Sequence, residues 1–229
     1  MANSLLGKSV LLAGATGGLG MALASELAKR GAVLTMVGRN ANVLSAIAVE
    51  GARHVADLRL PEACTDAVTA AIAHGGTLDV VINAVGVVAF GPIEDLSVDA
   101  MEELFLTNAF IPIMLAKASL PLMAEGGTIV NISGVIAEQN LPGMAAYGAS
   151  KAAVASFSQA LAREARRKKI HVLDARPPHT NTALSQHPLE GTAPRMPEGL
   201  SPAFVAGVIC DAIENNVPDL PSTSFTTLN

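Results

Sequence analysis

Short apolar runs alternate with longer segments of helical periodicity along most of the chain. The apolar runs predict strands at residues 9–13, 32–37, 53–56, 78–83, 128–132 and 170–175. The segments between them predict helices at 21–30, 41–50, 61–74, from Ser97 or Asp99 to Met123, at 145–169 and at 201–216. Because the strands are continuously apolar rather than alternating, helices are expected to cover both faces of their sheet.

Strands that alternate with helices predict βαβ units, and therefore a parallel sheet with right-handed crossovers. A chain of 229 residues is long enough for one such domain. We expect a single α/β domain over residues 1–229, with a doubly wound parallel sheet of about seven strands and helices on both faces. The segment at about 180–200, rich in Pro and Gly, is expected to be a mobile substrate loop.

Composition narrows the classes of function. The formal net charge of −5 argues against general nucleic-acid binding, which needs a basic surface. Cys64 and Cys210 offer no disulfide framework, which suits a reducing cytosol. The most apolar long stretch, 109–124, carries Lys117, so no membrane span is expected. The histidines lack metal-ligand spacing. The prediction is a cytoplasmic protein without a metal, a nucleic-acid partner or a membrane partner.

A glycine-rich turn follows the first predicted strand and precedes the first predicted helix. It reads Gly14-Ala15-Thr16-Gly17-Gly18-Leu19-Gly20. Gly14 permits a tight exit from the strand, Gly18 lets backbone N–H groups approach a pyrophosphate, and Gly20 lets the helix pack close to the sheet. The alternative is a plain glycine turn. Its position between strand and helix favours a dinucleotide-binding Rossmann domain.

The end of the second predicted strand addresses the choice of dinucleotide. An acidic residue there would hold the adenosine 2′-hydroxyl, but the sequence has Gly38-Arg39-Asn40. An arginine pairs with a 2′-phosphate and stacks on adenine. The alternative is a solvated surface arginine. Arg39 therefore favours NADP(H) over NAD(H).

The chain's one tyrosine, Tyr147, precedes Lys151 by four residues. This spacing puts both side chains on one face of a helix. A lysine cation beside a phenol is expected to lower the phenol pKa from about 10 toward neutral pH. Tyr147 could then exchange a proton with a carbonyl or alcohol oxygen. The alternative is a chance pair on a solvated helix.

Further motifs occur in a fixed order along the chain. After the Gly14–Gly20 turn come Asp57-Leu58, Asn83-Ala84-Val85-Gly86, Asn108, Asn131-Ile132-Ser133, Tyr147 with Lys151, and Arg176-Pro177. With these motifs the chain resembles the short-chain dehydrogenase/reductase family over essentially its whole length. The resemblance implies an NAD(P)(H)-dependent oxidoreductase that moves a hydride between nicotinamide and a small carbonyl or secondary alcohol.

The resemblance also implies roles for individual residues. Tyr147 would be the acid/base, Lys151 would bind the nicotinamide ribose and tune Tyr147, and Asn108 would hold a water in a proton relay. The other implied cofactor contacts are Thr16 and Leu19 in the glycine turn, Asp57 and Leu58 at the adenine, Asn83, Ala84 and Gly86 on the adenosine ribose side, and Pro177 and Thr182 near the nicotinamide amide.

The pattern departs from the family at the catalytic serine. Gly134 occupies the usual position, 13 residues before Tyr147, and the hydroxyl of Ser133 comes one residue early. Such a shift normally turns a side chain to the opposite face of a strand. Ser133 could still reach the site through an irregular backbone, another donor or a water could replace it, or catalysis could be weak. The last case would leave a cofactor-binding, redox-sensing protein. We expect an active enzyme and keep Ser133 as a catalytic candidate.

A second departure is Pro178, which follows Pro177 where the family usually has glycine. Proline lacks the N–H and stiffens this loop. His179, next along, would have a relay role or lie at the surface.

The two long predicted helices, at about 99–123 and 145–169, carry more apolar surface than one sheet face can cover. The stripes consist of Phe105, Phe110, Ile113 and Met114 on the first helix, and Val154, Phe157 and Leu161 on the second. Exposed apolar stripes of this size mark interfaces. We therefore expect a homodimer or homotetramer that forms through these helices.

Overall fold

One parallel sheet of seven strands organises the chain, for which a computed structural model describes residues 4–226. The strands are β1 (Ser9–Ala13), β2 (Val33–Gly38), β3 (Ala52–Val55), β4 (Val80–Asn83), β5 (Thr128–Ile132), β6 (His171–Ala175) and β7 (Asp219–Leu220). They lie in the order β3-β2-β1-β4-β5-β6-β7, and all neighbouring pairs are parallel. The doubly wound Rossmann topology predicted from the sequence is confirmed.

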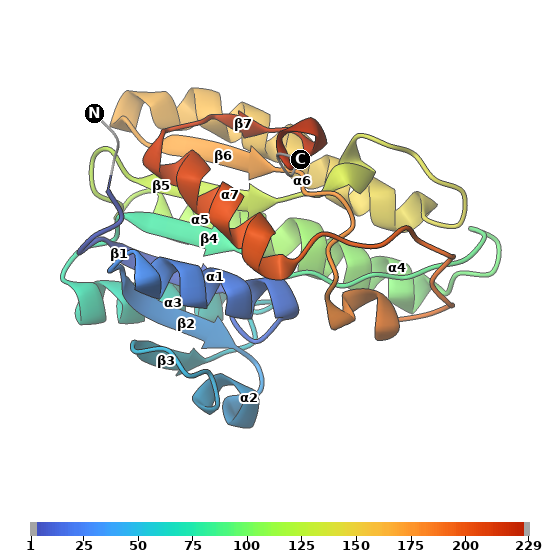
Figure 1. Ribbon diagram of the computed structural model, residues 1–229, viewed down its shortest axis with the longest axis horizontal. Helices are drawn as coiled ribbons and strands as arrows, with labels where there is room; N and C mark the ends of the chain where they lie inside the picture. Colours follow the sequence, from blue (N-terminus) through green and yellow to red (C-terminus); the bar gives the residue numbers. More distant parts are fainter. Residues whose placement is uncertain (1–3, 227–229) are drawn as a thin grey trace.

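Helices cover both faces of this sheet (Figure 1). Those of regular α type are α1 (Gly18–Lys29), α2 (Ala41–Ser45), α3 (Pro61–Gly75), α4 (Val98–Phe105), α5 (Ile111–Ser119), α6 (Ala145–Ala165) and α7 (Pro202–Glu214). A π-helical turn, η1 (Leu106–Phe110), joins α4 to α5. Shorter 3-10 turns are η2 (Val135–Ala137), η3 (Arg166–Lys168), η4 (Ala183–Gln186) and η5 (Ser222–Ser224).

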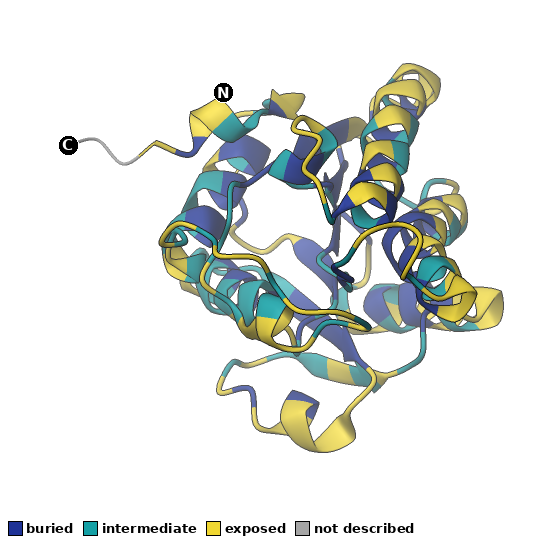
Figure 2. Ribbon diagram, turned by 90° about the vertical axis from the view of Figure 1, so that its right-hand side faces the viewer, coloured by how far each residue is buried: buried dark blue, intermediate teal, exposed yellow. Residues whose placement is uncertain are grey.

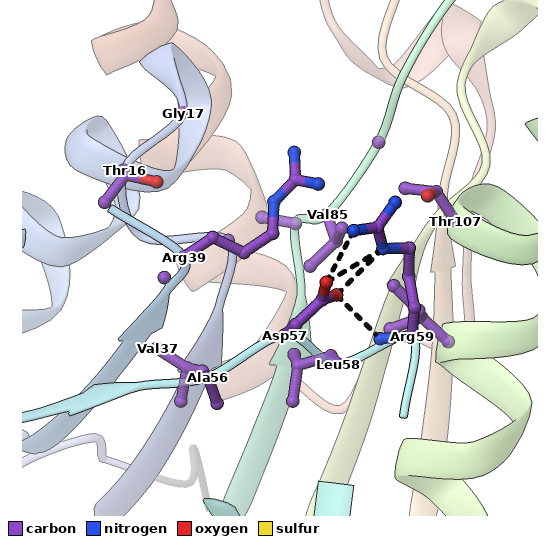
Figure 3. Close-up of a pocket in the computed structure, with 15 residues that line it drawn as sticks. Thr16, Gly17, Val37, Arg39, Ala56, Asp57, Leu58, Arg59, Val85 and Thr107 are labelled. Atoms are coloured by element: carbon purple, nitrogen blue, oxygen red, sulfur yellow. Dashed lines mark hydrogen bonds and ion pairs between the residues drawn. The ribbon is translucent and has the colours of Figure 1, made fainter. Parts of the chain in front are cut away.

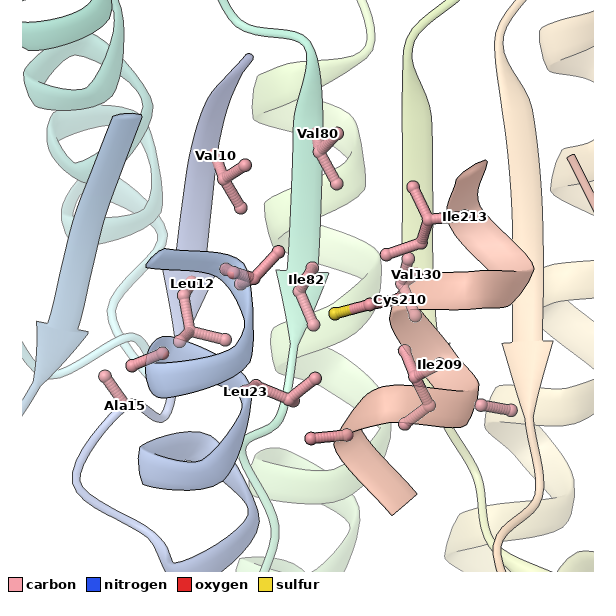
Figure 4. Close-up of a cluster of buried hydrophobic side chains, with 14 of the residues drawn as sticks. Val10, Leu12, Ala15, Leu23, Val80, Ile82, Val130, Ile209, Cys210 and Ile213 are labelled. Atoms are coloured by element: carbon pink, nitrogen blue, oxygen red, sulfur yellow. The ribbon is translucent and has the colours of Figure 1, made fainter. Parts of the chain in front are cut away.

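Two apolar cores lie on opposite faces of the sheet. Helices α1 and α7 pack on one face, where Leu12, Ile82 and Val130 meet Leu23 and Ile209 (Figure 4). Helices α3, α5 and α6 pack on the other face. The central strands β1, β2, β4 and β5 are buried between these layers, whereas the edge strand β3 is partly exposed and the outer sides of the helices are exposed (Figure 2). The carboxyl ends of all strands therefore lie at one edge, where a crevice for a ligand is expected in this class of fold.

Some elements differ from the sequence prediction. The last strand, β7, was not predicted because two residues carry no apolar run; it forms by pairing with β6. Helix α2 ends at Ser45, not at residue 50, because the following carbonyls bond to a side chain. The Arg53 guanidinium donates to the carbonyl oxygens of Leu44, Ile47 and Val49 at 2.8–3.1 Å. The Arg53 side chain thus takes the place of backbone N–H donors that a longer helix would provide for these carbonyls.

The two long predicted helices also end earlier than expected. The first is divided by η1 and stops at Ser119, and the second passes into η3 before Lys169 adopts a left-handed conformation. No helix in residues 4–226 is long and apolar enough to cross a membrane.

Candidate active site

A cavity of about 210 Å³ opens at the carboxyl ends of the central strands (Figure 3). The glycine turn forms one wall, and its close packing explains the glycines. Gly14 has φ +80°, and a Cβ atom there would lie 2.7 Å from the Ala84 carbonyl carbon. At Gly20 a Cβ would lie 2.0 Å from the Gly14 carbonyl oxygen, so only glycine lets α1 start this close to β1.

The amino end of α1 is open toward this cavity. Gly17 is its N-cap and offers no side-chain cap, and the first turn contains no acidic residue. The first N–H groups of a helix lack intrahelical partners and carry partial positive charge. This end of α1 therefore suits an anion such as a pyrophosphate. Thr182 packs against the same turn, since a Cβ at Gly18 would lie 2.9 Å from the Thr182 Cβ.

Two arginines flank the far end of the cavity (Figure 3). Arg59 donates to Asp57 at 2.5–3.0 Å and to Glu103 at 3.0 Å. These hydrogen bonds from Arg59 lower the pKa of Asp57, although burial opposes them. Within residues 4–226, Arg39 has no hydrogen bond or ion pair. Arg59 is thus committed to acidic side chains, whereas Arg39 is exposed and acts on Asp57 only through its charge.

Half of the predicted cofactor residues line this cavity. Its lining includes Gly14, Thr16, Gly17, Arg39, Asp57, Leu58, Ala84 and Gly86. Sequence reasoning missed the other lining residues, which are Val37, Gly38, Ala56, Arg59, Val85, Thr107 and Ile111. Gly38 and Val85 stood inside the quoted motifs without an assigned role, and Arg59 left a signal as a second cation two residues after the predicted Asp57. Asn83 is buried behind the lining, and its Oδ1 has no hydrogen-bond partner among the described residues.

Lys151 and Asn108 come together beside Gly86, and Tyr147 lies one helical turn before Lys151 on α6. A Cβ at Gly86 would lie 3.5 Å from both Asn108 Oδ1 and Lys151 Nζ. The Lys151 ammonium donates to the Ile132 carbonyl oxygen at 2.8 Å. Asn108 Nδ2 donates to the Ser150 hydroxyl at 3.0 Å, and that hydroxyl donates to the Tyr147 carbonyl oxygen at 2.7 Å. Residues far apart in sequence therefore converge on one small space.

The π-helical turn η1 sets the position of Asn108. Its amide is held at both ends, because Oδ1 accepts from the Val87 N–H and Nδ2 donates to the Val87 carbonyl, both at 2.9 Å. Pro112 lies four residues after Asn108; it has no N–H, and its ring clashes with the carbonyl of the residue four positions earlier. A wider π turn relieves this conflict, and such turns are frequent at functional sites. Pro112 was the sequence signal that could have predicted the break.

Burial controls the electrostatics of the tyrosine and the lysine. Tyr147 packs among Val88, Phe90, Ile136 and Met144. Desolvation raises the pKa of Tyr147 to about 12 and lowers the pKa of Lys151 to about 8, with Asp174 opposing the second change. The expected lowering of the tyrosine pKa is thus wrong for this state of the protein. In an apolar pocket the loss of water disfavours the charged phenolate.

The missing serine is explained by the backbone after β5. Gly134 has φ +83° and ψ 163°, a conformation that is essentially restricted to glycine. The N–H groups of Gly134 and Val135 already donate to the carbonyls of Ala175 and Pro177. The Ser133 side chain is fully buried, and its hydroxyl donates to Asp174 Oδ1 at 2.6 Å. The Ser133 hydroxyl is therefore enclosed rather than open to a substrate.

The segment at 180–200 closes over the apolar side of the site. A backbone bridge joins Thr180 to Leu200 at its base. Near its middle, the Leu189 N–H donates to the Val88 carbonyl at 2.8 Å, and the Phe90 N–H donates to the Glu190 carbonyl at 2.9 Å. The Glu190 carboxylate accepts from the Ser97 hydroxyl at 2.5 Å, at the N-cap of α4. His179, at the start of the segment, is half-buried. The mobility of this segment stays a prediction.

Comparison with known proteins relates this arrangement to one family. The family described as short chain dehydrogenase matches residues 8–192. The chain is similar to an uncharacterized oxidoreductase of Methylorubrum extorquens, with 31% identity over 90% of each protein. It is also similar to dehydrogenase/reductase SDR family member 7B of Mus musculus, with 32% identity over 94% of this chain and 73% of the relative.

A solved structure extends the likeness to three dimensions. The crystal structure of a short chain dehydrogenase from Burkholderia cenocepacia in complex with NADP has 26% identity and a TM-score of 0.84, over 96% of this chain and 98% of that one. The glycine turn, the sheet order and the matched sequence agree with one another. The chain belongs to the short-chain dehydrogenase/reductase family and is an oxidoreductase.

Proposed function

We propose that this protein is an NADP(H)-preferring oxidoreductase that interconverts a carbonyl compound and a secondary alcohol, with Tyr147 as the acid/base. The observation that carries the proposal is that Lys151 and Asn108 meet beside Gly86, which also lines the cavity of the glycine turn, with Tyr147 one turn before Lys151 on α6. In this proposal one domain over residues 1–229 performs the reaction in the cytoplasm.

The groups around the cavity support binding of a phosphorylated dinucleotide. When bound, NADP(H) supplies or accepts the hydride. The open amino end of α1 and the close-packed Gly14 and Gly20 suit the pyrophosphate. Arg39 is free to pair with a 2′-phosphate, whereas the Asp57 carboxylate is occupied by Arg59. A free cation, without a free carboxylate to bind a ribose 2′-hydroxyl, supports NADP(H) over NAD(H).

The side chains support reduction of a carbonyl. With a pKa near 12, the Tyr147 phenol is protonated at neutral pH and can donate to an oxygen that gains negative charge. The Lys151 ammonium would hold the nicotinamide ribose hydroxyls and favour the phenolate that remains after proton transfer. Asn108 and Ser150 connect the centre to the Val87 backbone and fix its geometry.

The walls beside Tyr147 favour a hydrophobic substrate. Val88, Phe90, Ile136 and Met144 form an apolar cluster around the ring, and Ala193 packs against it from the 180–200 segment. Burial of apolar substrate surface here would contribute about 25 cal/mol per Å². A small hydrophobic ketone or alcohol is therefore the proposed substrate class.

Removal of the phenol oxygen tests the mechanism. Tyr147→Phe keeps the ring in its apolar cluster, so cofactor affinity should stay unchanged while carbonyl reduction falls by about 10² or more. The measurements are NADPH consumption with a panel of ketones and calorimetric titration of NADPH. Full activity in Tyr147→Phe would exclude Tyr147 as the acid/base.

A second candidate function is a cofactor-binding, redox-sensing protein with little turnover. The enclosed Ser133 hydroxyl and the glycine at residue 134 favour it, because a carbonyl donor is missing. Loss of such a donor typically costs about 10²–10³ in rate. Tight binding of NADPH without turnover of any ketone or alcohol in the panel would select this function.

The proposed assembly is a homodimer or homotetramer. Phe105, Phe110 and Ile113 are 41%, 56% and 37% exposed on the consecutive elements α4, η1 and α5. Pairing of these elements with a second copy would remove apolar surface from water. The exposed apolar stripe expected on α6 is wrong, because Val154 and Leu161 are only 2% and 5% exposed and pack within the chain.

A further inference from the structure

A buried carboxylate, Asp174, lies near Lys151 at the end of β6. Asp174 of β6 is 2% exposed and pairs in register with Asn131 of β5. Asn131 Nδ2 donates to the Ser158 hydroxyl of α6 at 2.9 Å, so this position of β5 faces α6. Asp174 Oδ1 accepts from the Ser133 hydroxyl at 2.6 Å, and Oδ2 accepts from Arg176 at 2.5 Å.

Lys151 reaches the same face of the sheet from α6. Its side chain is buried and donates to the carbonyl oxygen of Ile132, the residue between Asn131 and Ser133. A buried ammonium with one neutral partner is costly to keep charged. Asp174 favours the charged form, because its negative charge acts on Lys151 against desolvation.

We propose that Asp174 is a positioning residue of this centre: its charge keeps Lys151 protonated, and its bond to Ser133 fixes the strand end whose carbonyl receives the ammonium. The role of Lys151 in the reaction rests on the proposed function. The hydroxyl of Ser133 is in this arrangement a ligand of Asp174 rather than of a substrate.

The groups that face Lys151 can be named element by element. Tyr147 lies on its own helix, Asn108 comes from η1 and is neutral, and Asp174 comes from β6. Behind Asp174 stands Arg176, which also pairs with Glu138 and with Asp219 at 2.8 Å. Arg176 therefore offsets part of the negative charge of Asp174 and sets how strongly that charge acts on Lys151.

This arrangement predicts opposite effects of two substitutions. Asp174→Asn keeps the shape but removes the negative charge, so the Lys151 pKa should fall. Arg176→Gln removes the compensating cation, so the Lys151 pKa should rise. General disruption of packing would not move one group in both directions.

The experiment is an NMR titration of the protein without cofactor, labelled with [ε-¹³C]lysine. Lys151→Arg identifies the Lys151 signal, which should titrate near 8 in the wild type. Asp174→Asn should lower this midpoint by about 1, as expected for loss of a nearby opposite charge. Asp79→Asn is the matched control: this carboxylate is also buried and accepts from the Ser9 N–H at 2.9 Å, but at the amino end of β1.

Unchanged midpoints in both Asp174→Asn and Arg176→Gln would overturn the proposal, as would an equal shift in Asp79→Asn. If Asp174→Asn does not fold, the rise of the Lys151 pKa expected in Arg176→Gln is by itself the test of the proposal. In the active enzyme, the basic limb of the pH profile of kcat/KM should move in the same direction as each midpoint. Because the titration needs no cofactor or substrate, it separates failure of this inference from failure of the proposed reaction.

Discussion

Substitution of Gly134 tests whether the backbone itself excludes the family serine. At φ +83° and ψ 163° a side chain of any L-residue is strained, by about 1–3 kcal/mol. Space is not the obstacle, because a Cβ at Gly134 would meet only the Pro177 carbonyl oxygen, at 3.9 Å. The alanine variant has lower conformational entropy in its unfolded state, and this offsets about 0.4–1 kcal/mol of the strain. Gly134→Ala should therefore lower the free energy of unfolding by about 1–2 kcal/mol.

Urea denaturation and thermal melting measure this loss. A change of 1–2 kcal/mol corresponds to a decrease in Tm of roughly 2–8 °C for a chain of this size. Gly207→Ala is the matched control, since Gly207 lies inside α7 with an ordinary φ and nothing within 4 Å of its Cβ. This control should gain about 0.5–1 kcal/mol, because alanine favours a helix. Equal effects of the two substitutions would refute the strain at Gly134.

The effect of the missing hydroxyl follows from a comparison of Gly134→Ser with Gly134→Ala. Both variants carry the same backbone strain, so the ratio of their kcat values isolates the hydroxyl. Because the hydroxyl of Ser133 is committed to Asp174, we expect the serine variant to exceed the alanine variant by about tenfold or more. Equal kcat values would show that no carbonyl donor is missing at this position.

Three further predictions concern charge and assembly. Arg39→Ala should weaken NADPH binding by about tenfold to a hundredfold in calorimetry and leave NADH binding unchanged; tighter binding of NADH than NADPH by the wild type would contradict the assignment. Lys151→Met should raise the free energy of unfolding at pH 7 by up to about 3 kcal/mol, because the folded-state pKa near 8 lies below the unfolded value. Wild-type stability should then rise between pH 8 and 10.5 and that of the variant should not, which urea titrations at each pH would reveal. Light scattering at micromolar concentration should give a dimer or tetramer, and Phe110→Glu should shift it toward monomer; a monomeric wild type would exclude the interface.

Much of the fold could be predicted from local pattern. Continuous apolar runs identified the buried strands, because a strand covered on both faces needs apolar side chains on both. The short edge strand β3 was also predicted, although Arg53 and Val55 in it are exposed. The glycine turn was also readable, since Gly14 and Gly20 occupy places where any Cβ would collide with backbone. Strand β7 and the early end of α2 were not predictable, because pairing with β6 and the Arg53 side chain decide them.

The residue types of the candidate site were also visible in the sequence. The spacing of four residues put Tyr147 and Lys151 on one helical face. The absence of an acidic residue after β2 indicated Arg39 as the candidate contact for a 2′-phosphate. The hydroxyl at Ser133 was likewise recognised as one residue out of place. The sequence by itself determined which chemical groups are present and the order in which the strands and helices carry them.

Only the tertiary structure decided what those groups do to one another. Burial, not the neighbouring ammonium, governs the pKa of Tyr147, and burial depends on segments distant in sequence such as Val88 and Ala193. The partner of Ser133 is Asp174 because β5 and β6 pair in one register, which no local pattern specifies. Desolvation and long-range pairing act through space, so side chains far apart along the chain set the charge and position of each reacting group.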